Sequence, residues 1–254
     1  VLECIDLGIT FGGLKAVDNF NVTIGRTEIT GLIGPNGAGK TTVFNLLTKV
    51  YQPTHGTILL NGKDIHDLNT AQVNRAGIAR TFQNIRLFGE LSVEENITVA
   101  MDTQMHYTMP EGIFRLPRFW KEERIVHERA MELLSIFHME DLAKAKASSL
   151  PYGAQRRLEI LRALATNPSL LLLDEPAAGM NPSETAELME NIRSIRDTFK
   201  IAVLLIEHDM NLVMNICEGI AVLNFGHVIA KGTPEDIQNN PEVIEAYLGK
   251  QKEA

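Results

Sequence analysis

The segment Gly34–Thr41 constrains this chain more than any other part of it. It reads Gly-Pro-Asn-Gly-Ala-Gly-Lys-Thr, follows the predicted strand Glu28–Ile33 and precedes a helical stretch that runs to Lys49. A glycine-rich turn between a strand and a helix, closed by Lys and Thr, is the pattern of a phosphate-binding P-loop. It predicts a nucleotide-binding α/β fold. The alternative is a plain strand-to-helix turn, but such a turn does not need the Lys-Thr pair.

The P-loop residues have separate expected tasks. The glycines let consecutive backbone N–H groups turn toward a phosphate, and the helix start adds partial positive charge. Lys40 is expected to reach the β- and γ-phosphates, and the Thr41 hydroxyl to ligate Mg²⁺. The residues of this loop expected to contact the nucleotide are Gly34, Pro35, Asn36, Gly37, Ala38, Gly39, Lys40, Thr41 and Thr42.

A second acidic element follows the leucine run Leu170–Leu173, which is typical of a buried strand. Asp174 is expected to hold Mg²⁺, and Glu175 to act as general base on the attacking water. An adjacent Asp-Glu pair beside a P-loop indicates hydrolysis rather than nucleotide storage. The alternative is a strand that ends at solvated carboxylates.

Length and composition set limits on the remaining classes. The 254 residues predict one core with a sizeable insertion, and the 44% hydrophobic and 22% charged residues argue against disordered and disulfide-scaffold proteins. With 24 Lys+Arg against 32 Asp+Glu, the net charge of −8 has the wrong sign for a protein that binds nucleic acid through its phosphates. Cys4 and Cys217 have no CxxC spacing, which fits a reducing compartment.

No apolar run reaches the roughly 18 to 20 residues of a membrane span, and no signal-peptide pattern is present. We therefore expect a cytoplasmic protein. The chain opens at Val1 rather than at a methionine, so its true start is expected to be missing or processed.

The pattern of strands and helices divides the chain. Strands are expected at Leu2–Leu7, Phe20–Ile24, Glu28–Ile33, Thr57–Leu60, Leu170–Leu173, Ile201–Ile206 and Ile220–Asn224. Helical spacing without strands is expected between about Asn84 and Thr166, at Val93–Met101, Glu122–Phe137 and Gln155–Thr166. A last helix is expected from Asn240-Pro241. The expected domains are an α/β core of residues 1–83 and 166–254, and a helical subdomain of residues 84–165.

With both motifs in place, the chain resembles the ATP-binding cassette (ABC) ATPase family over nearly its whole length. The resemblance implies a P-loop NTPase fold with a parallel β core, an N-terminal antiparallel β subdomain and an inserted α-helical subdomain. It also implies ATP and Mg²⁺ as ligands.

Three further residues take roles from this resemblance. Gln83, after Thr81-Phe82, resembles the glutamine that contacts Mg²⁺ and the attacking water; the alternative is a solvated turn residue. His208 resembles the switch histidine that hydrogen-bonds the γ-phosphate, and a capping histidine is the alternative. Phe11 resembles the aromatic that stacks on adenine, or else belongs to the core.

The family signature, of the type Leu-Ser-Gly-Gly-Gln, corresponds here to Leu150-Pro151-Tyr152-Gly153-Ala154 followed by Gln155. By resemblance, Tyr152 and Gly153 face the nucleotide bound by an opposite subunit. The family serine is replaced by Pro151, which has neither hydroxyl nor N–H and should stabilise phosphate charge less well. The alternative is a helix-entry loop.

The segment Ala178–Asn181 occupies the position of the family's D-loop, which crosses to the partner subunit. Local capping of a helix by Asn181, Pro182 and Glu184 is the alternative.

The signature, the switch Glu207–Met210 and the ending Asn240–Gly249 together resemble the ATP-binding subunits of branched-chain amino-acid importers. That resemblance implies a second ATPase subunit, or a homodimer in isolation, together with two membrane permeases and an extracytoplasmic binding protein. It places the chain on the inner face of the cell membrane. An exporter ATPase of the lipopolysaccharide-export type, a soluble cassette of translation or DNA repair, and a regulatory module without turnover remain alternatives.

The segment Phe114–Lys121 interleaves aromatic and basic residues and contains the only tryptophan of the chain. It could dock on a membrane partner. The alternative, which we favour from the sequence, is that its aromatic side chains pack under arginine stems.

Overall fold

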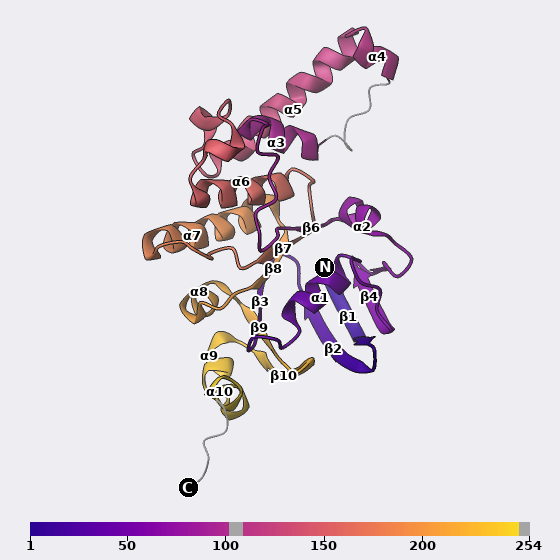
Figure 1. Ribbon diagram of the computed structural model, residues 1–254, viewed down its shortest axis with the longest axis vertical. Helices are drawn as coiled ribbons and strands as arrows, with labels where there is room; N and C mark the ends of the chain where they lie inside the picture. The colour runs from indigo at the N-terminus through magenta and orange to yellow at the C-terminus, as the bar shows by residue number, and fades with distance from the viewer. Residues whose placement is uncertain (102–108, 249–254) are drawn as a thin grey trace. The chain divides into compact units, whose positions relative to one another are not determined.

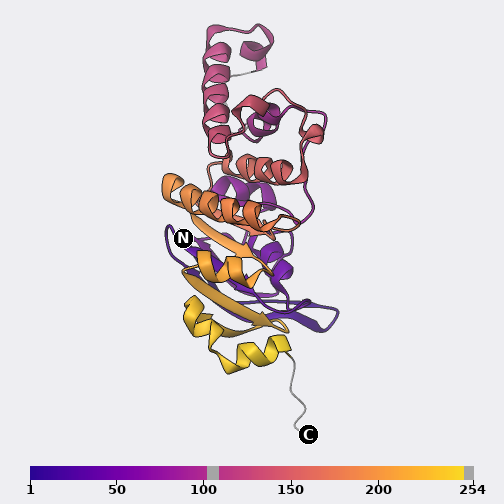
Figure 2. The same cartoon turned by 90° about the vertical axis from the view of Figure 1, so that its left-hand side faces the viewer.

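The computed structural model describes residues 1–101 and 109–248, and its contacts divide the chain into two compact units. The first unit consists of Val1–Gln83 and Pro168–Ala254, and the second of Asn84–Asn167. Figures 1 and 2 show sheets and helices in the first unit and helices in the second. The expected division fell after residues 83 and 165, whereas the structure divides after 83 and 167.

A six-stranded sheet forms the centre of the first unit. Its strands, in spatial order, are β10 (His227–Gly232), β9 (Gly219–Asn224), β3 (Ile29–Ile33), β8 (Ala202–Ile206), β7 (Leu170–Asp174) and β6 (Ile78–Arg80). Five strands run parallel, and β10 is antiparallel to β9. Every residue of β3, β7 and β8 is buried, which explains their continuous apolar sequences. The predicted parallel core is confirmed; β10 was not predicted.

A second sheet is antiparallel and comes from the N-terminal part of the chain. Its order is β2 (Leu14–Ile24), β1 (Leu2–Phe11), β4 (His55–Leu60) and β5 (Lys63–Asp64). One buried cluster joins side chains of both sheets and of helix α1 (Lys40–Leu47), including Leu7, Phe20, Phe44, Leu172 and Leu204. Removing these apolar side chains from water stabilises the packing of the two sheets. The expected antiparallel β subdomain is therefore present.

The helices of the first unit mostly begin at polar caps. They are α1 (Lys40–Leu47), α2 (Thr70–Ala76), α7 (Pro182–Phe199), α8 (Met210–Ile216), α9 (Pro234–Gln238) and α10 (Pro241–Leu248). Helix α7 begins with a capping box in which Asn181 and Glu184 bond each other's backbone N–H groups, so the local-capping interpretation of these residues is confirmed. Helices α2 and α9 were not predicted from the sequence.

The described part of the second unit is helical apart from one isolated bridge between Ser92 and Lys146. Its α-helices are α3 (Val93–Ala100), α4 (Met109–Ile113), α5 (Pro117–Ser135) and α6 (Tyr152–Leu164), joined by the 3₁₀ turns Glu140–Leu142 and Ala147–Ser149. Both α5 and α6 start earlier than predicted. In α5, Pro117 takes the first helical position, where its missing N–H has no cost.

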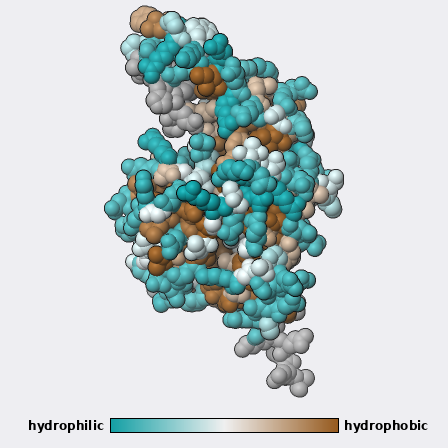
Figure 3. Space-filling model, turned by 180° about the vertical axis from the view of Figure 1, so that it is seen from behind, coloured by the Kyte–Doolittle hydropathy of each residue, from teal (hydrophilic) through white to brown (hydrophobic). Residues whose placement is uncertain are grey.

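The aromatic side chains of Phe114–Lys121 lie largely at the surface. Phe114 is 74% exposed and Trp120 is 57% exposed, with the Arg115 guanidinium 5.9 Å from the centre of the Trp120 ring. The Arg115 contact agrees with the predicted packing of arginine on an aromatic ring, but that packing leaves both rings exposed. Figure 3 shows some brown, apolar residues among hydrophilic ones on the surface of the helical unit. Docking by this segment stays a prediction.

Candidate nucleotide site

The loop between β3 and α1 has a backbone that only glycine can provide at key positions. Gly34 has φ +151°, and a Cβ built on it would lie 2.0 Å from the carbonyl oxygen of Leu223. Gly39 has φ +107°, and its Cβ would lie 2.8 Å from the carbonyl oxygen of Ala16. The loop is thus held tightly against neighbouring backbone, and its conformation excludes larger residues.

The start of α1 is suited to an anion. Gly39 precedes the helix without a side-chain cap, and the first turn carries no acidic residue. The N–H groups and the positive end of the helix dipole therefore remain available to a phosphate. Helices α7 and α9, by contrast, begin with capping boxes.

The Lys40 side chain folds back over the loop. Its Nζ donates to the carbonyl oxygens of Gly34 at 2.7 Å and Pro35 at 3.0 Å. Burial lowers the pKa of Lys40, and the negative charges of Glu175 and Asp174 oppose that shift. Burial thus disfavours the charged form of Lys40, and a bound phosphate would stabilise that form.

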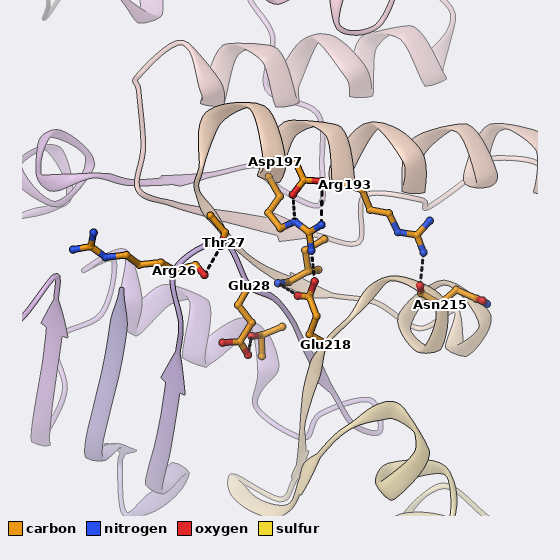
Figure 4. Close-up of polar contacts among 10 residues, drawn as sticks. Arg26, Thr27, Glu28, Arg193, Asp197, Asn215 and Glu218 are labelled. Carbon is orange, nitrogen blue, oxygen red and sulfur yellow. Dashed lines mark hydrogen bonds and ion pairs between the residues drawn. The ribbon is translucent and has the colours of Figure 1, made fainter.

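A polar cluster anchors the start of β3, the strand that leads into the P-loop. The Glu218 carboxylate accepts hydrogen bonds from the backbone N–H of Ile29 and from Arg196 of α7. Arg196 also binds the neighbouring Asp197, and Arg193 donates to the Asn215 carbonyl oxygen (Figure 4). The cluster ties β3, α7 and the end of α8 together, and so fixes the scaffold behind the loop.

Three of the predicted residues meet at the carboxyl end of the sheet. The Glu175 carboxylate accepts from Gln83 Nε2 at 3.0 Å through Oε2, and it lies 2.6 Å from His208 Nε2 through Oε1. Strand order explains the meeting, because Asp174 pairs with Ile206 across β7 and β8, and the two strands end side by side. The backbone of Glu175 has φ +48°, a conformation that a non-glycine residue seldom adopts.

Asp174, the last residue of β7, is 3% exposed and forms an ion pair that the sequence analysis missed. Its Oδ2 accepts a hydrogen bond of 2.8 Å from Arg80 Nη2. Arg80 ends the short strand β6, which lies beside β7 in the sheet. In the sequence, Arg80 is a single arginine after Ile78-Ala79, three residues before Gln83, and this was the only sign of the ion pair.

Glu207 is a second buried carboxylate that the sequence analysis used only as part of a motif. It is 4% exposed and accepts backbone hydrogen bonds from Ala177 at 2.8 Å and His208 at 3.1 Å. Burial raises the pKa of Glu207 although these N–H groups favour its ionised form. The residue joins the switch histidine to the turn that follows Glu175.

Phe11 closes strand β1 and is 43% exposed, so its interpretation as a core residue is wrong. Its ring meets Tyr51 edge to face, with 5.2 Å between ring centres and 74° between planes. An exposed aromatic pair of this kind offers a surface on which a planar base can stack.

Tyr152 and Gly153 belong to the second unit, whereas the other predicted site residues belong to the first. Pro151 occupies the N-cap position of α6 and provides no side-chain cap. Tyr152 is 48% exposed. Gln155 turns back to donate to the Leu150 carbonyl oxygen at 2.8 Å.

The donor set for a metal consists of oxygen atoms. The predicted ligands provide a hydroxyl from Thr41, a carboxylate from Asp174 and an amide oxygen from Gln83, which suit Mg²⁺. No group of three or more His, Cys, Asp and Glu residues suited to a metal occurs within the described ranges. The residues therefore fit a Mg²⁺ ion that takes its remaining ligands from phosphate and water.

Comparison with known proteins agrees with this geometry. A family model described as ABC transporter matches residues 17–178, and one described as branched-chain amino acid ATP-binding cassette transporter matches residues 227–253. The high-affinity branched-chain amino acid transport ATP-binding protein LivG of Escherichia coli K12 is 50% identical over 98% of both chains. The corresponding protein BraF of Pseudomonas aeruginosa is 47% identical, also over 98% of each.

A solved nucleotide-free ATP-binding cassette from an ABC transporter superposes with a TM-score of 0.84 at 31% identity, covering 98% of this chain and 99% of its own. Across residues 1–101 and 109–248, no helix is long and apolar enough to span a membrane. Sequence, fold and site geometry lead to one assignment: the chain belongs to the family of ABC transporter ATP-binding proteins.

Proposed function

We propose that this chain is the ATP-binding and ATP-hydrolysing subunit of an importer for branched-chain amino acids. Assignment of ATP hydrolysis is supported by the contact of Glu175 with both Gln83 and His208, near the P-loop residue Lys40. The substrate class is supported by the two relatives at 50% and 47% identity, which are named for branched-chain amino acid transport.

Binding is assigned to residues of the first unit. The P-loop residues Gly34–Thr42 surround the phosphates, with Lys40 facing the β- and γ-phosphates. Phe11 stacks on adenine through its exposed ring. Thr41, Gln83 and Asp174 would hold Mg²⁺, which when bound neutralises charge on the phosphate oxygens.

Hydrolysis is assigned to Glu175 as general base. Its carboxylate takes a proton from water while the water oxygen bonds to the γ-phosphorus. The bond from the γ-phosphorus to the bridging oxygen of the β-phosphate breaks, and ADP and phosphate leave. Each carboxylate oxygen has one of these hydrogen-bonding neighbours and can accept a second hydrogen bond, so the attacking water can bond to Glu175 beside them. We assign to His208 a move away from Glu175, after which it donates to the γ-phosphate.

The two units divide this work. The first unit binds nucleotide, and the second presents Tyr152 and Gly153 to the nucleotide of another ATPase subunit. Since Pro151 lacks a hydroxyl, the cognate partner is a second, different ATPase, and an isolated chain forms at most a less active homodimer. Two permease subunits hold the pair on the inner face of the cell membrane, and an extracytoplasmic binding protein delivers the substrate.

The test is reconstitution of this chain with its cognate second ATPase and permeases in lipid vesicles. ATP-dependent uptake of labelled leucine, isoleucine or valine is expected when the binding protein is added. Glu175→Gln should abolish uptake, and Glu190→Gln, at an exposed carboxylate of α7, should leave it unchanged. Hydrolysis stimulated by lipopolysaccharide, without amino-acid uptake, would favour an exporter ATPase instead.

A further inference from the structure

Arg80 has a buried guanidinium at the carboxyl end of the sheet, and it links two elements of the nucleotide site. Only 7% of its side chain is exposed. Besides the 2.8 Å bond from Nη2 to Asp174, Nη1 donates to Asn45 Oδ1 of helix α1 at 2.7 Å. The planar guanidinium therefore connects the acidic end of β7 to the helix that begins at the P-loop.

The surroundings of Arg80 are unusual for a residue that only fills space. Its Cζ atom lies 5.4 Å from the ring centre of Phe44 and 5.3 Å from that of Phe82. Its Nε is buried and has no hydrogen-bond partner among the described residues. A buried donor without an acceptor is unfavourable, and the hydrogen bonds to Asp174 and Asn45 together with the two ring contacts offset that cost.

That charge matters because the site contains carboxylates where phosphate is expected to bind. Lys40 experiences the charges of Asp174 and Glu175, so those carboxylates lie close enough to act electrostatically on the P-loop. An ATP triphosphate brings further negative charge, which the two carboxylates repel. Arg80 offsets the charge of Asp174 through a protein group, whether or not a divalent ion is present.

We infer that Arg80 is a positioning residue that fixes the Asp174 carboxylate and supplies the positive charge that lets the site accept ATP before a divalent ion arrives. The inference rests on the proposed function, because that proposal assigns Asp174 and the P-loop to ATP. It also predicts how the demand for Mg²⁺ changes when the charge of Arg80 is removed.

The test separates charge from shape by comparing Arg80→Gln with Arg80→Lys. The probe is the non-hydrolysable ATP analogue with an imido bridge, titrated once with Mg²⁺ and once with EDTA. Arg80→Gln, which keeps hydrogen-bonding capacity but no charge, should lose about tenfold in affinity under EDTA, on the scale of one nearby unit charge. With Mg²⁺ its affinity should change much less. Arg80→Lys keeps the charge but loses the planar group that also bonds Asn45, so under EDTA it should lose less affinity than Arg80→Gln. The control Arg75→Gln, at an exposed position of α2, should stay close to wild type in both titrations.

Equal loss of affinity with and without Mg²⁺ in Arg80→Gln would overturn the inference while leaving the proposed function intact. If the analogue binds under neither condition, even to the wild-type chain, the proposed function fails as well. A further measurement uses only the wild-type chain and so does not depend on how the variants fold. Millimolar Mg²⁺ without nucleotide should leave the melting temperature unchanged, because Arg80 already binds Asp174, and a clear rise would contradict the inference.

Discussion

Lys40 and Glu207 of the first unit differ from Glu94 of the second in how their buried charges are held. In the first unit, burial lowers the pKa of Lys40 and raises the pKa of Glu207, so both groups are ionised at a cost. In the second unit, burial also opposes ionisation of Glu94, but hydrogen bonds from Lys144 and His127, each 2.6 Å long, outweigh it. The pKa of Glu94 consequently lies below its ordinary value.

The difference shows where a ligand can contribute binding energy. An ion pair such as Glu94–Lys144 is already compensated and gains little from an added charge. Lys40 is surrounded mainly by carbonyl oxygens of its own loop, so a phosphate improves its environment. Lys40, a charged group held at a cost, therefore belongs to the predicted nucleotide site, whereas the compensated Glu94 belongs to the framework of the second unit.

The largest effect is expected when Lys40 is removed. Lys40→Ala should weaken MgATP binding by at least about 100-fold, since it deletes charge-assisted hydrogen bonds worth roughly 1.5–3 kcal/mol each. Lys63→Ala, at an exposed position of β5, is the control. Calorimetric titration with ATP measures both, and an unchanged affinity in Lys40→Ala would remove the P-loop assignment.

A smaller gain is expected from restoring the signature hydroxyl in the second unit. Pro151→Ser should raise ATP hydrolysis by the isolated chain, with an upper limit of about 2.7–4 kcal/mol of transition-state stabilisation. Pro117→Ser, at the start of α5 in the same unit, should not. Addition of the cognate second ATPase should raise turnover further. Full-rate, cooperative hydrolysis by the wild-type homodimer would show that Pro151 does not slow ATP hydrolysis.

Next in size is the stacking of adenine on Phe11. Phe11→Ala should weaken ATP binding by roughly 1 to 3 kcal/mol, and Phe11→Tyr should be nearly neutral. Because the ring is 43% exposed, the melting temperature should change little. If Phe11→Ala lowers the melting temperature but not the affinity, the residue serves packing against Tyr51 instead.

The smallest effect contrasts the pH dependence of Glu207 and Glu94. A raised pKa means that the native state of Glu207 binds more protons than the unfolded chain just above pH 4.5, so its contribution to stability falls as pH rises there. Glu94 has a lowered pKa, so its contribution is complete above pH 4.5 and is lost as pH falls through the native value. Urea unfolding of Glu207→Gln and Glu94→Gln between pH 3 and 7, each against wild type, should give differences of opposite slope. Slopes of the same sign would contradict the comparison.

The sequence predicted the parts of the site that local patterns encode. The P-loop, the Asp174-Glu175 pair and the parallel core follow from residues that are neighbours in the chain. Gln83 and His208 came only from family resemblance, and their shared contact with Glu175 depends on the strand order of the sheet.

Long-range polar contacts were not predictable in this way. Arg80 and Asp174 are 94 residues apart and meet only because β6 lies next to β7. Glu207 accepts hydrogen bonds from backbone N–H groups, which almost every residue carries, so the sequence does not indicate which ones bind it. The exposure of Phe114 and Trp120 could not be predicted, because the pattern of aromatic and basic residues is the same whether the rings are buried or not.

We assign Glu175 as the general base of an ATPase whose nucleotide-binding residues lie in the first unit. The most direct measurement compares MgATP affinity and steady-state hydrolysis in wild type and Glu175→Gln, assayed together with the cognate second ATPase. If Glu175 is the base, Glu175→Gln should bind MgATP with near wild-type affinity while turnover at this chain's site falls by about 10² to 10⁴-fold, the range of general-base catalysis. Hydrolysis at this site near the wild-type rate in Glu175→Gln would contradict it.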